Sequence, residues 1–213
     1  MKPTLTIMTG PQGSGNHLFS KALGQNKHIW VWPDLQTEYW VGHDLEPFAE
    51  YWKEPAKLKD FDWSQSNHFV TSISCPYFDD GVESIPQYHD FIRHASDYTD
   101  IQVLVIGRDK NITEFQQERV RGRVTTNMFM KQLPNLLQHN VTFASQELLY
   151  LYKLPYLQWM EAQLGLSSDE LTVSSTILDR ILMINSNTKY ISQSKATRLD
   201  DTIKIVSSRK GKV

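Results

Sequence analysis

The sequence predicts an α/β domain in which an open, parallel β-sheet lies between two layers of helices. Two observations lead to this prediction. Short, continuous apolar runs of strand length alternate with longer segments of helical periodicity along the chain. The runs also lack the in–out alternation of a half-exposed strand, which is typical of parallel strands buried on both faces. With 213 residues and 40% hydrophobic residues, the chain can form one compact domain with its own core.

The predicted elements follow in order. The first strand, Thr4 to Thr9, ends in Gly10 and Pro11, and Asn16 to Leu23 then forms a helix that Gly24 terminates. The other predicted strands are residues 28–32, 69–74, 101–106 and 141–144. The other predicted helices are residues 112–120, 128–137, 148–164 and 176–185. In a sheet of this kind, ligands bind beyond the carboxyl ends of the strands.

The composition of the chain argues against binding to nucleic acid or to a membrane surface. A net charge of −2 gives no global attraction to nucleic acid or to an anionic membrane, so neither is expected as a partner. The single cysteine, Cys75, leaves no internal disulfide, and the short apolar start does not resemble a signal peptide. We therefore expect a cytoplasmic protein. The last ten residues are basic, which is consistent either with a solvated tail or with an anion contact.

The clearest functional pattern lies between the first strand and the first helix. Residues 10–17 read Gly-Pro-Gln-Gly-Ser-Gly-Asn-His. Three glycines let the backbone turn tightly so that successive N–H groups converge, and the following helix adds its positive N-terminal end. The pattern predicts a P-loop that binds a phosphate group without a cationic side chain. A plain glycine-rich turn is the alternative.

Two residues of this turn differ from the P-loop of ATP- and GTP-hydrolysing enzymes and disfavour such an activity. The nucleoside-triphosphatase P-loop ends in Gly-Lys-Ser/Thr, where the lysine reaches the outer phosphates and the hydroxyl holds magnesium. Here Gly15 is followed by Asn16 and His17. A kinase is disfavoured for the same reason.

A strand, then Ser-Gly-Asn, then a helix resembles the sulfotransferase family, which uses 3′-phosphoadenylyl sulfate (PAPS) as donor and releases 3′-phosphoadenosine 5′-phosphate (PAP). The resemblance implies that the donor's 5′-phosphosulfate binds to Gly13, Ser14, Gly15, Asn16 and His17. Many family members carry a lysine or arginine at the position of Gly13, so this chain departs from the pattern there.

A second segment extends the resemblance. A predicted buried strand ends at Gly107 and Arg108, and a helix follows. In the family, an arginine here and a serine eight residues later hold the donor's 3′-phosphate. Arg108 matches the arginine, and Gln116, a longer hydrogen-bonding residue, stands at the serine position. The alternative for Arg108 is a surface ion pair with Asp109 or Glu114.

Two later segments add to the match. Residues 141–166 resemble the family's late strand, acidic-leucine turn and helix, and support the fold more than the chemistry. Arg209, Lys210 and Gly211 resemble the Arg-Lys-Gly loop that closes over the 3′-phosphate, although the chain ends soon after it. The resemblance implies one domain over residues 1–213 with an aromatic-rich helical insertion at about 34–66.

The catalytic residues of the family are not evident. Its usual histidine after the third strand is replaced by Ser74, a poor base. Substitutes are His43 and Glu38, which follow the second strand, and His17 inside the turn, which could supply a proton or charge to the leaving group. His68 is placed at the amino end of its strand, the wrong edge.

Five of the six tryptophans fall between Trp30 and Trp63. They form either an acceptor pocket with flat faces for sugars or apolar rings, or the aromatic core of a helical subdomain. The leading functional hypothesis is transfer of a sulfuryl group from PAPS to a hydroxyl or amine on a small-molecule or glycan acceptor. The alternatives are a catalytically silent nucleotide-binding protein on the same fold and, third, a P-loop kinase.

Overall fold

A computed structural model describes residues 2–26, 29–30, 46–79, 82–166 and 175–183 of the chain, all within the unit formed by Met1–Met183. Five parallel strands form its main sheet: β1 (Thr4–Pro11), β2 (Ile29–Trp30), β3 (His68–Cys75), β6 (Asp100–Gly107) and β7 (Asn140–Ser145). Their spatial order is β2-β3-β1-β6-β7. The predicted fold class, an open parallel sheet with helices on both faces, is confirmed.

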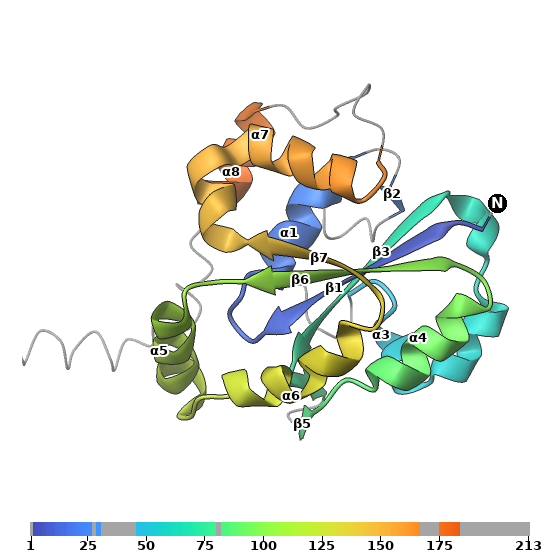
Figure 1. The fold of residues 1–213 in the computed structure, drawn as a ribbon, viewed down its shortest axis with the longest axis horizontal. Coiled ribbons are helices and arrows are strands. Elements are labelled where there is room, and N and C mark those ends of the chain that lie inside the picture. The colour runs from blue at the N-terminus through green and yellow to red at the C-terminus, as the bar shows by residue number, and fades with distance from the viewer. Residues whose placement is uncertain (1, 27–28, 31–45, 80–81, 167–174, 184–213) are drawn as a thin grey trace, which may run out of the picture. The chain divides into compact units, whose positions relative to one another are not determined.

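Helices cover the two faces of the sheet, which gives three layers (Figure 1). One face carries α1 (Asn16–Leu23), α7 (Gln146–Gln163) and α8 (Ser175–Met183). The other carries α3 (Ala49–Lys53), α4 (Tyr88–Ser96) and α6 (Thr126–Leu136), with short 3₁₀ turns at Pro55–Asp60 and Trp63–Gln65. α5 (Lys110–Arg121) lies beyond the carboxyl ends of the strands (Figure 1).

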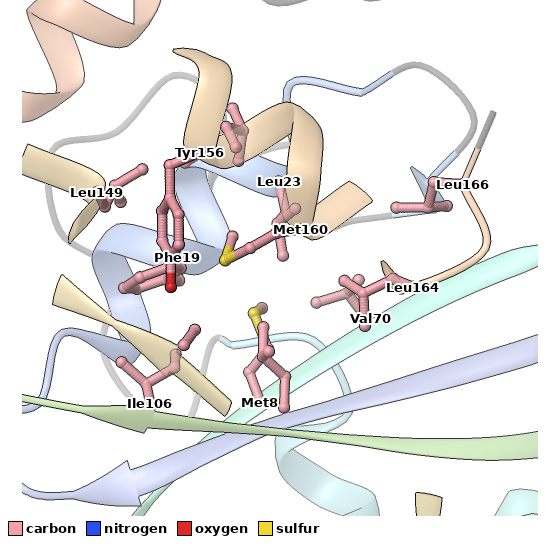
Figure 2. Close-up of a cluster of buried hydrophobic side chains, with 14 of the residues drawn as sticks. Met8, Phe19, Leu23, Val70, Ile106, Leu149, Tyr156, Met160, Leu164 and Leu166 are labelled. Carbon is pink, nitrogen blue, oxygen red and sulfur yellow. The ribbon is translucent and has the colours of Figure 1, made fainter. Parts of the chain in front are cut away.

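Two apolar cores hold these layers together. On the α1 side, Met8 and Ile106 of the sheet contact Phe19, Leu149 and other buried side chains (Figure 2). Burial of each such side chain contributes roughly 1.5–3 kcal/mol. The continuous burial of β1 explains why its sequence shows no alternation, since both faces of this central strand are covered.

The local signals in the sequence placed most elements correctly. The first helix has the predicted bounds, Asn16–Leu23, followed by Gly24. One predicted helix is not regular, because Lys153 has φ 47° and ψ −120° inside α7, two residues before Pro155. The chain is therefore kinked there rather than continuously helical over 148–164.

Three further elements were not predicted, namely α4 and the antiparallel strands β4 (Tyr77–Asp79) and β5 (Val82–Ser84). The short helix α3 lies within the segment where a helical insertion was predicted. In the described part of the chain, no helix combines the length and the apolarity needed to cross a lipid bilayer.

The strand order creates a topological switch point at the carboxyl edge of the sheet. After β1 the chain continues into α1 on one face, whereas after β6 it continues through α5 into α6 on the other (Figure 1). β1 and β6 are direct neighbours in the sheet. Such a switch point is where open parallel sheets bind ligands, and it places residues 10–17 beside Arg108.

Candidate functional site

The turn between β1 and α1 has the backbone geometry of an anion-binding loop. Gly13 and Gly15 have φ values of 86° and 103°, in the left-handed region that favours glycine. The Ser14 N–H donates to the Pro11 carbonyl at 3.0 Å and closes the turn. Within the described residues, the N–H groups of Gly13 and Gly15 donate no hydrogen bond. These two N–H groups are therefore available to an anion at the start of α1.

Gly10 holds this turn against the sheet. A Cβ atom at Gly10 would lie 2.4 Å from the Ile106 carbonyl oxygen and 2.6 Å from Oγ of Ser14. The close approach of the turn to β6 thus requires the absence of a side chain at this position.

The side chains of Ser14 and Asn16 face the protein. Ser14 Oγ donates to Asn16 Oδ1 at 3.0 Å, and Asn16 Nδ2 donates to the Ile73 carbonyl at 3.2 Å and to Ser74 Oγ at 3.1 Å. Both side chains are buried. They shape the turn and tie it to the end of β3, so backbone groups rather than these side chains are the binding groups that the turn offers.

Arg108 reaches the same turn from the end of β6. Its Nη1 donates to the Gly13 carbonyl at 3.2 Å and to Oε1 of Gln116 at 2.6 Å. Arg108 thus joins residues that the resemblance assigned to the two ends of the donor, since it donates hydrogen bonds both to Gly13 and to Gln116. The carboxamide of Gln116 accepts from Arg108 through its oxygen, which leaves its NH₂ group to donate elsewhere.

The predicted alternative for Arg108, an ion pair with Asp109 or Glu114, is not what the structure records. Asp109 caps α5 by accepting a hydrogen bond from the Ile112 N–H at 3.0 Å. Glu114 forms an ion pair with Lys110 instead, with Oε1 of Glu114 3.9 Å from Nζ of Lys110. The nearby carboxylate is instead Glu147, at the start of α7. Burial alone would raise the pKa of Glu147, but hydrogen bonds from the Asp109 N–H and Ser145 and the charge of Arg108 lower it overall.

His17 lies in the first turn of α1 and contacts a buried carboxylate. Its Nδ1 is 3.1 Å from Oε1 of Glu46, which is only 4% exposed, and Glu46 Oε2 accepts from Ser72 Oγ at 2.5 Å. Glu46 therefore connects α1 to β3 next to the turn. No local sequence pattern indicates this pair, because the two residues are 29 positions apart.

Some of the remaining predicted site residues lie outside the described part of the chain, and others lie within it. His43, Glu38, Arg209, Lys210 and Gly211 lie outside the described residues. His68 begins β3 at its amino end, as expected. Arg121, the last residue of α5, lies with its guanidinium carbon 4.3 Å from the centroid of the Phe78 ring, and Arg123, just after the helix, pairs with Glu83.

The described part of the aromatic segment is a core rather than an open pocket. Trp30, Phe48, Phe61 and Trp63 contact one another with ring centroids 4.6–5.6 Å apart, and they pack on Phe69 of β3. Trp52 stacks on Phe91 of α4 at 3.8 Å. Of the two interpretations left open, the described residues fit the aromatic core.

Sequence reasoning missed a buried polar network behind the turn. Gln12, Gln117 and Thr125 are each at most 3% exposed and are joined by hydrogen bonds. The partners lie up to 113 positions apart, so only the fold brings them together.

Comparison with known proteins gives distant similarities. No protein-family model and no curated protein sequence matches the chain. Among solved structures, a mouse sulfotransferase, SULT7A1, in complex with PAP matches at 10% identity and a TM-score of 0.49, over 88% of this chain and 70% of that one.

Two retinol dehydratase structures also match, one with androsterone and inactive cofactor PAP and one with retinol and PAP. Both are 15% identical over 85% of this chain and 64% of theirs, with TM-scores of 0.33 and 0.32, so this chain spans less than two thirds of their length. Similarity at this level does not assign the chain to a family or to an activity.

Proposed function

We propose that the chain binds a nucleotide carrying phosphates at its 5′ and 3′ positions and uses PAPS as a sulfuryl donor to a hydroxyl or amine acceptor. The observation that carries the proposal is the position of Arg108. Its guanidinium lies against Gly13 of the anion-binding turn and against Gln116 of α5. The carboxyl edge of the sheet thus offers two candidate anion sites, which follow two neighbouring strands, β1 and β6.

The chemistry of the two sites fits a bisphosphorylated nucleotide. The free N–H groups of Gly13 and Gly15, with the start of α1, suit the 5′ anion, where no side-chain cation is needed. Arg108 and the NH₂ group of Gln116 suit a 3′-phosphate through charge-assisted hydrogen bonds. In the described residues no lysine occupies the turn, which favours this ligand over the triphosphate of ATP.

When bound, PAPS supplies the sulfuryl group, which passes from a phosphate oxygen to the acceptor oxygen or nitrogen, while the acceptor's proton goes to a base. The role of this chain is to hold the donor in line and to stabilise charge on the departing phosphate. His17 is our candidate to act on that phosphate, since it follows the turn directly and Glu46 orients its ring. His43 and Glu38 remain candidates for the base.

The alternative is a catalytically silent nucleotide-binding protein, which one contact favours. Ser74 stands where the resembled family has a histidine, and its Oγ already accepts from Asn16. A serine hydroxyl engaged in this way is a poor base for an acceptor's proton.

An assay with ³⁵S-labelled PAPS and a panel of phenols, alcohols, amines and sugars distinguishes a sulfotransferase from a catalytically silent nucleotide-binding protein. Transfer of label to any acceptor, lost in the Arg108→Ala variant and kept in the Arg93→Ala variant, supports the enzyme. Arg93 is an exposed arginine of α4 and serves as the matched control. Nucleotide binding without transfer supports the silent protein. No binding of PAP at millimolar concentration by the folded chain would contradict both.

A further inference from the structure

Gln117 is a nearly inaccessible glutamine directly behind the anion-binding turn. Its side chain is 2% exposed. Its Nε2 donates to the Gln12 carbonyl at 2.7 Å. Its Oε1 accepts from the Thr125 N–H at 2.7 Å and from the N–H and the hydroxyl of Thr126, both at 3.1 Å. This single carboxamide therefore joins the turn to the start of α6.

These partners fix the orientation of the carboxamide. Two backbone N–H groups can only donate and one backbone carbonyl can only accept, so the oxygen of Gln117 must face α6 and its nitrogen must face the turn. Rotation of the side chain would leave buried donors and an acceptor without partners. Each such loss costs about 1–3 kcal/mol.

The hydrogen bond from Gln117 to the Gln12 carbonyl also fixes the direction of the Gly13 N–H, which belongs to the same peptide group. In a trans peptide the C=O and the following N–H point in opposite directions, so holding the Gln12 carbonyl towards Gln117 directs the Gly13 N–H away from it. This N–H donates no hydrogen bond within the described residues. Gly13 has φ 86°, and a glycine at this point allows the peptide to rotate unless it is held.

We propose that Gln117 is a positioning residue that aims the Gly13 N–H at the bound 5′ anion. The inference rests on the proposed function for the identity of that anion. Gln117 stands on α5 immediately after Gln116, which contacts Arg108. Two adjacent glutamines thus serve the two anion sites: Gln116 holds the guanidinium on the 3′ side, and Gln117 orients the backbone on the 5′ side.

The test compares Gln117→Met, an uncharged variant of similar length, with Glu118→Met, its exposed neighbour on the same helix. Three ligands are titrated by calorimetry: PAP, adenosine 5′-monophosphate and adenosine 3′-monophosphate. Gln117→Met should weaken the two ligands that carry a 5′-phosphate by about tenfold or more, and should leave adenosine 3′-monophosphate within about twofold. Glu118→Met should change none of them. An equal loss for all three ligands would mean that Gln117 has only a structural role and would overturn the proposal.

A second measurement needs no nucleotide. In ¹⁵N relaxation of the ligand-free protein, the Gly13 amide should gain fast motion in Gln117→Met while the amides of β1 keep their order. Unchanged relaxation at Gly13 would overturn the proposal whether or not nucleotides bind. Failure of the wild-type protein to bind any of the three ligands, with Gly13 mobilised by the variant, would instead contradict the proposed function alone. If Gln117→Met does not fold, Thr126→Val removes one donor to Gln117 and should mobilise Gly13 in the same direction.

Discussion

Arg108 donates a 2.6 Å hydrogen bond to Oε1 of Gln116, eight residues farther along the chain. The bond holds the guanidinium beside the turn without itself neutralising the positive charge, because the acceptor is a neutral amide. An anion can therefore still use that charge.

Replacing Gln116 with glutamate tests this arrangement. The carboxylate of Gln116→Glu would pair with Arg108 and neutralise it, and it would repel a 3′-phosphate. We expect PAP to bind at least about tenfold more weakly, a loss of about 1.4 kcal/mol, and adenosine 5′-monophosphate to bind nearly as before. Calorimetry measures both affinities. Gln116→Ser, whose neutral hydroxyl can still donate a hydrogen bond, should retain PAP binding. An equal loss of affinity in the two variants would argue against the charge effect.

Gly10 and Gly107, each near the carboxyl end of its strand, can be compared by replacing each of them with alanine. A Cβ atom at Gly10 would lie 2.4 Å from the Ile106 carbonyl, whereas at Gly107 the nearest atom, the Ala144 carbonyl oxygen, is 3.7 Å away. Gly10→Ala should destabilise the protein by about 1–3 kcal/mol through overpacking, and Gly107→Ala should cost much less. Urea unfolding gives both free energies. Similar values for the two variants would contradict the close approach of the turn to β6.

Asn16 connects the turn to β3, so its removal should cost stability. Asn16→Ala leaves the buried Ser14 hydroxyl without its acceptor and removes one of the two side-chain donors to the Ile73 carbonyl, which keeps its bond from Thr9. We expect a loss of about 1–3 kcal/mol in the free energy of unfolding. Asn111→Ala, at an exposed position of α5, is the control and should have little effect. An unchanged stability of Asn16→Ala would show that the Asn16 bonds are not needed to hold the turn.

Glu161 should make stability depend on pH. Burial raises the pKa of Glu161, against the opposing effect of the 2.9 Å hydrogen bond from Asn26. Below its unfolded-state pKa both states carry the proton, and as pH rises through the raised folded-state pKa the protein loses stability. Glu161→Gln should remove this loss and make the protein more stable than the wild type at pH 7. Chemical unfolding between pH 4 and about 8 measures it. Glu118→Gln, at an exposed position, is the control and should show the same pH dependence of stability as the wild type. If Glu161→Gln also showed the wild-type pH dependence, Glu161 would not be its source.

The sequence predicted those parts of the fold that local signals determine. The apolar run of β1, the three glycines and the stop at Gly24 placed the first strand, turn and helix, because each depends on neighbouring residues alone. α4 also had a signal, since Tyr88, Phe91, Ile92 and Ala95 follow helical spacing and are buried, but it was not recognised. The kink at Lys153 had its signal in Pro155.

The candidate site was predictable only in part, for a physical reason. The turn and Arg108 stand at the ends of buried strands, so the topology of the sheet brings them together. The contacts of Gln117 with Gln12 and of His17 with Glu46 depend on side chains 105 and 29 positions apart, and no pattern in a single sequence specifies them.

A thermodynamic cycle on Arg108 tests the central claim most directly. PAP and adenosine 5′-monophosphate, which differ by the 3′-phosphate, are titrated into the wild-type protein and into Arg108→Ala. We predict that the wild type prefers PAP by about tenfold or more, and that Arg108→Ala binds both nucleotides with nearly equal affinity. If the preference for PAP were the same in both proteins, Arg108 would not bind the 3′-phosphate, and the proposed site would be wrong.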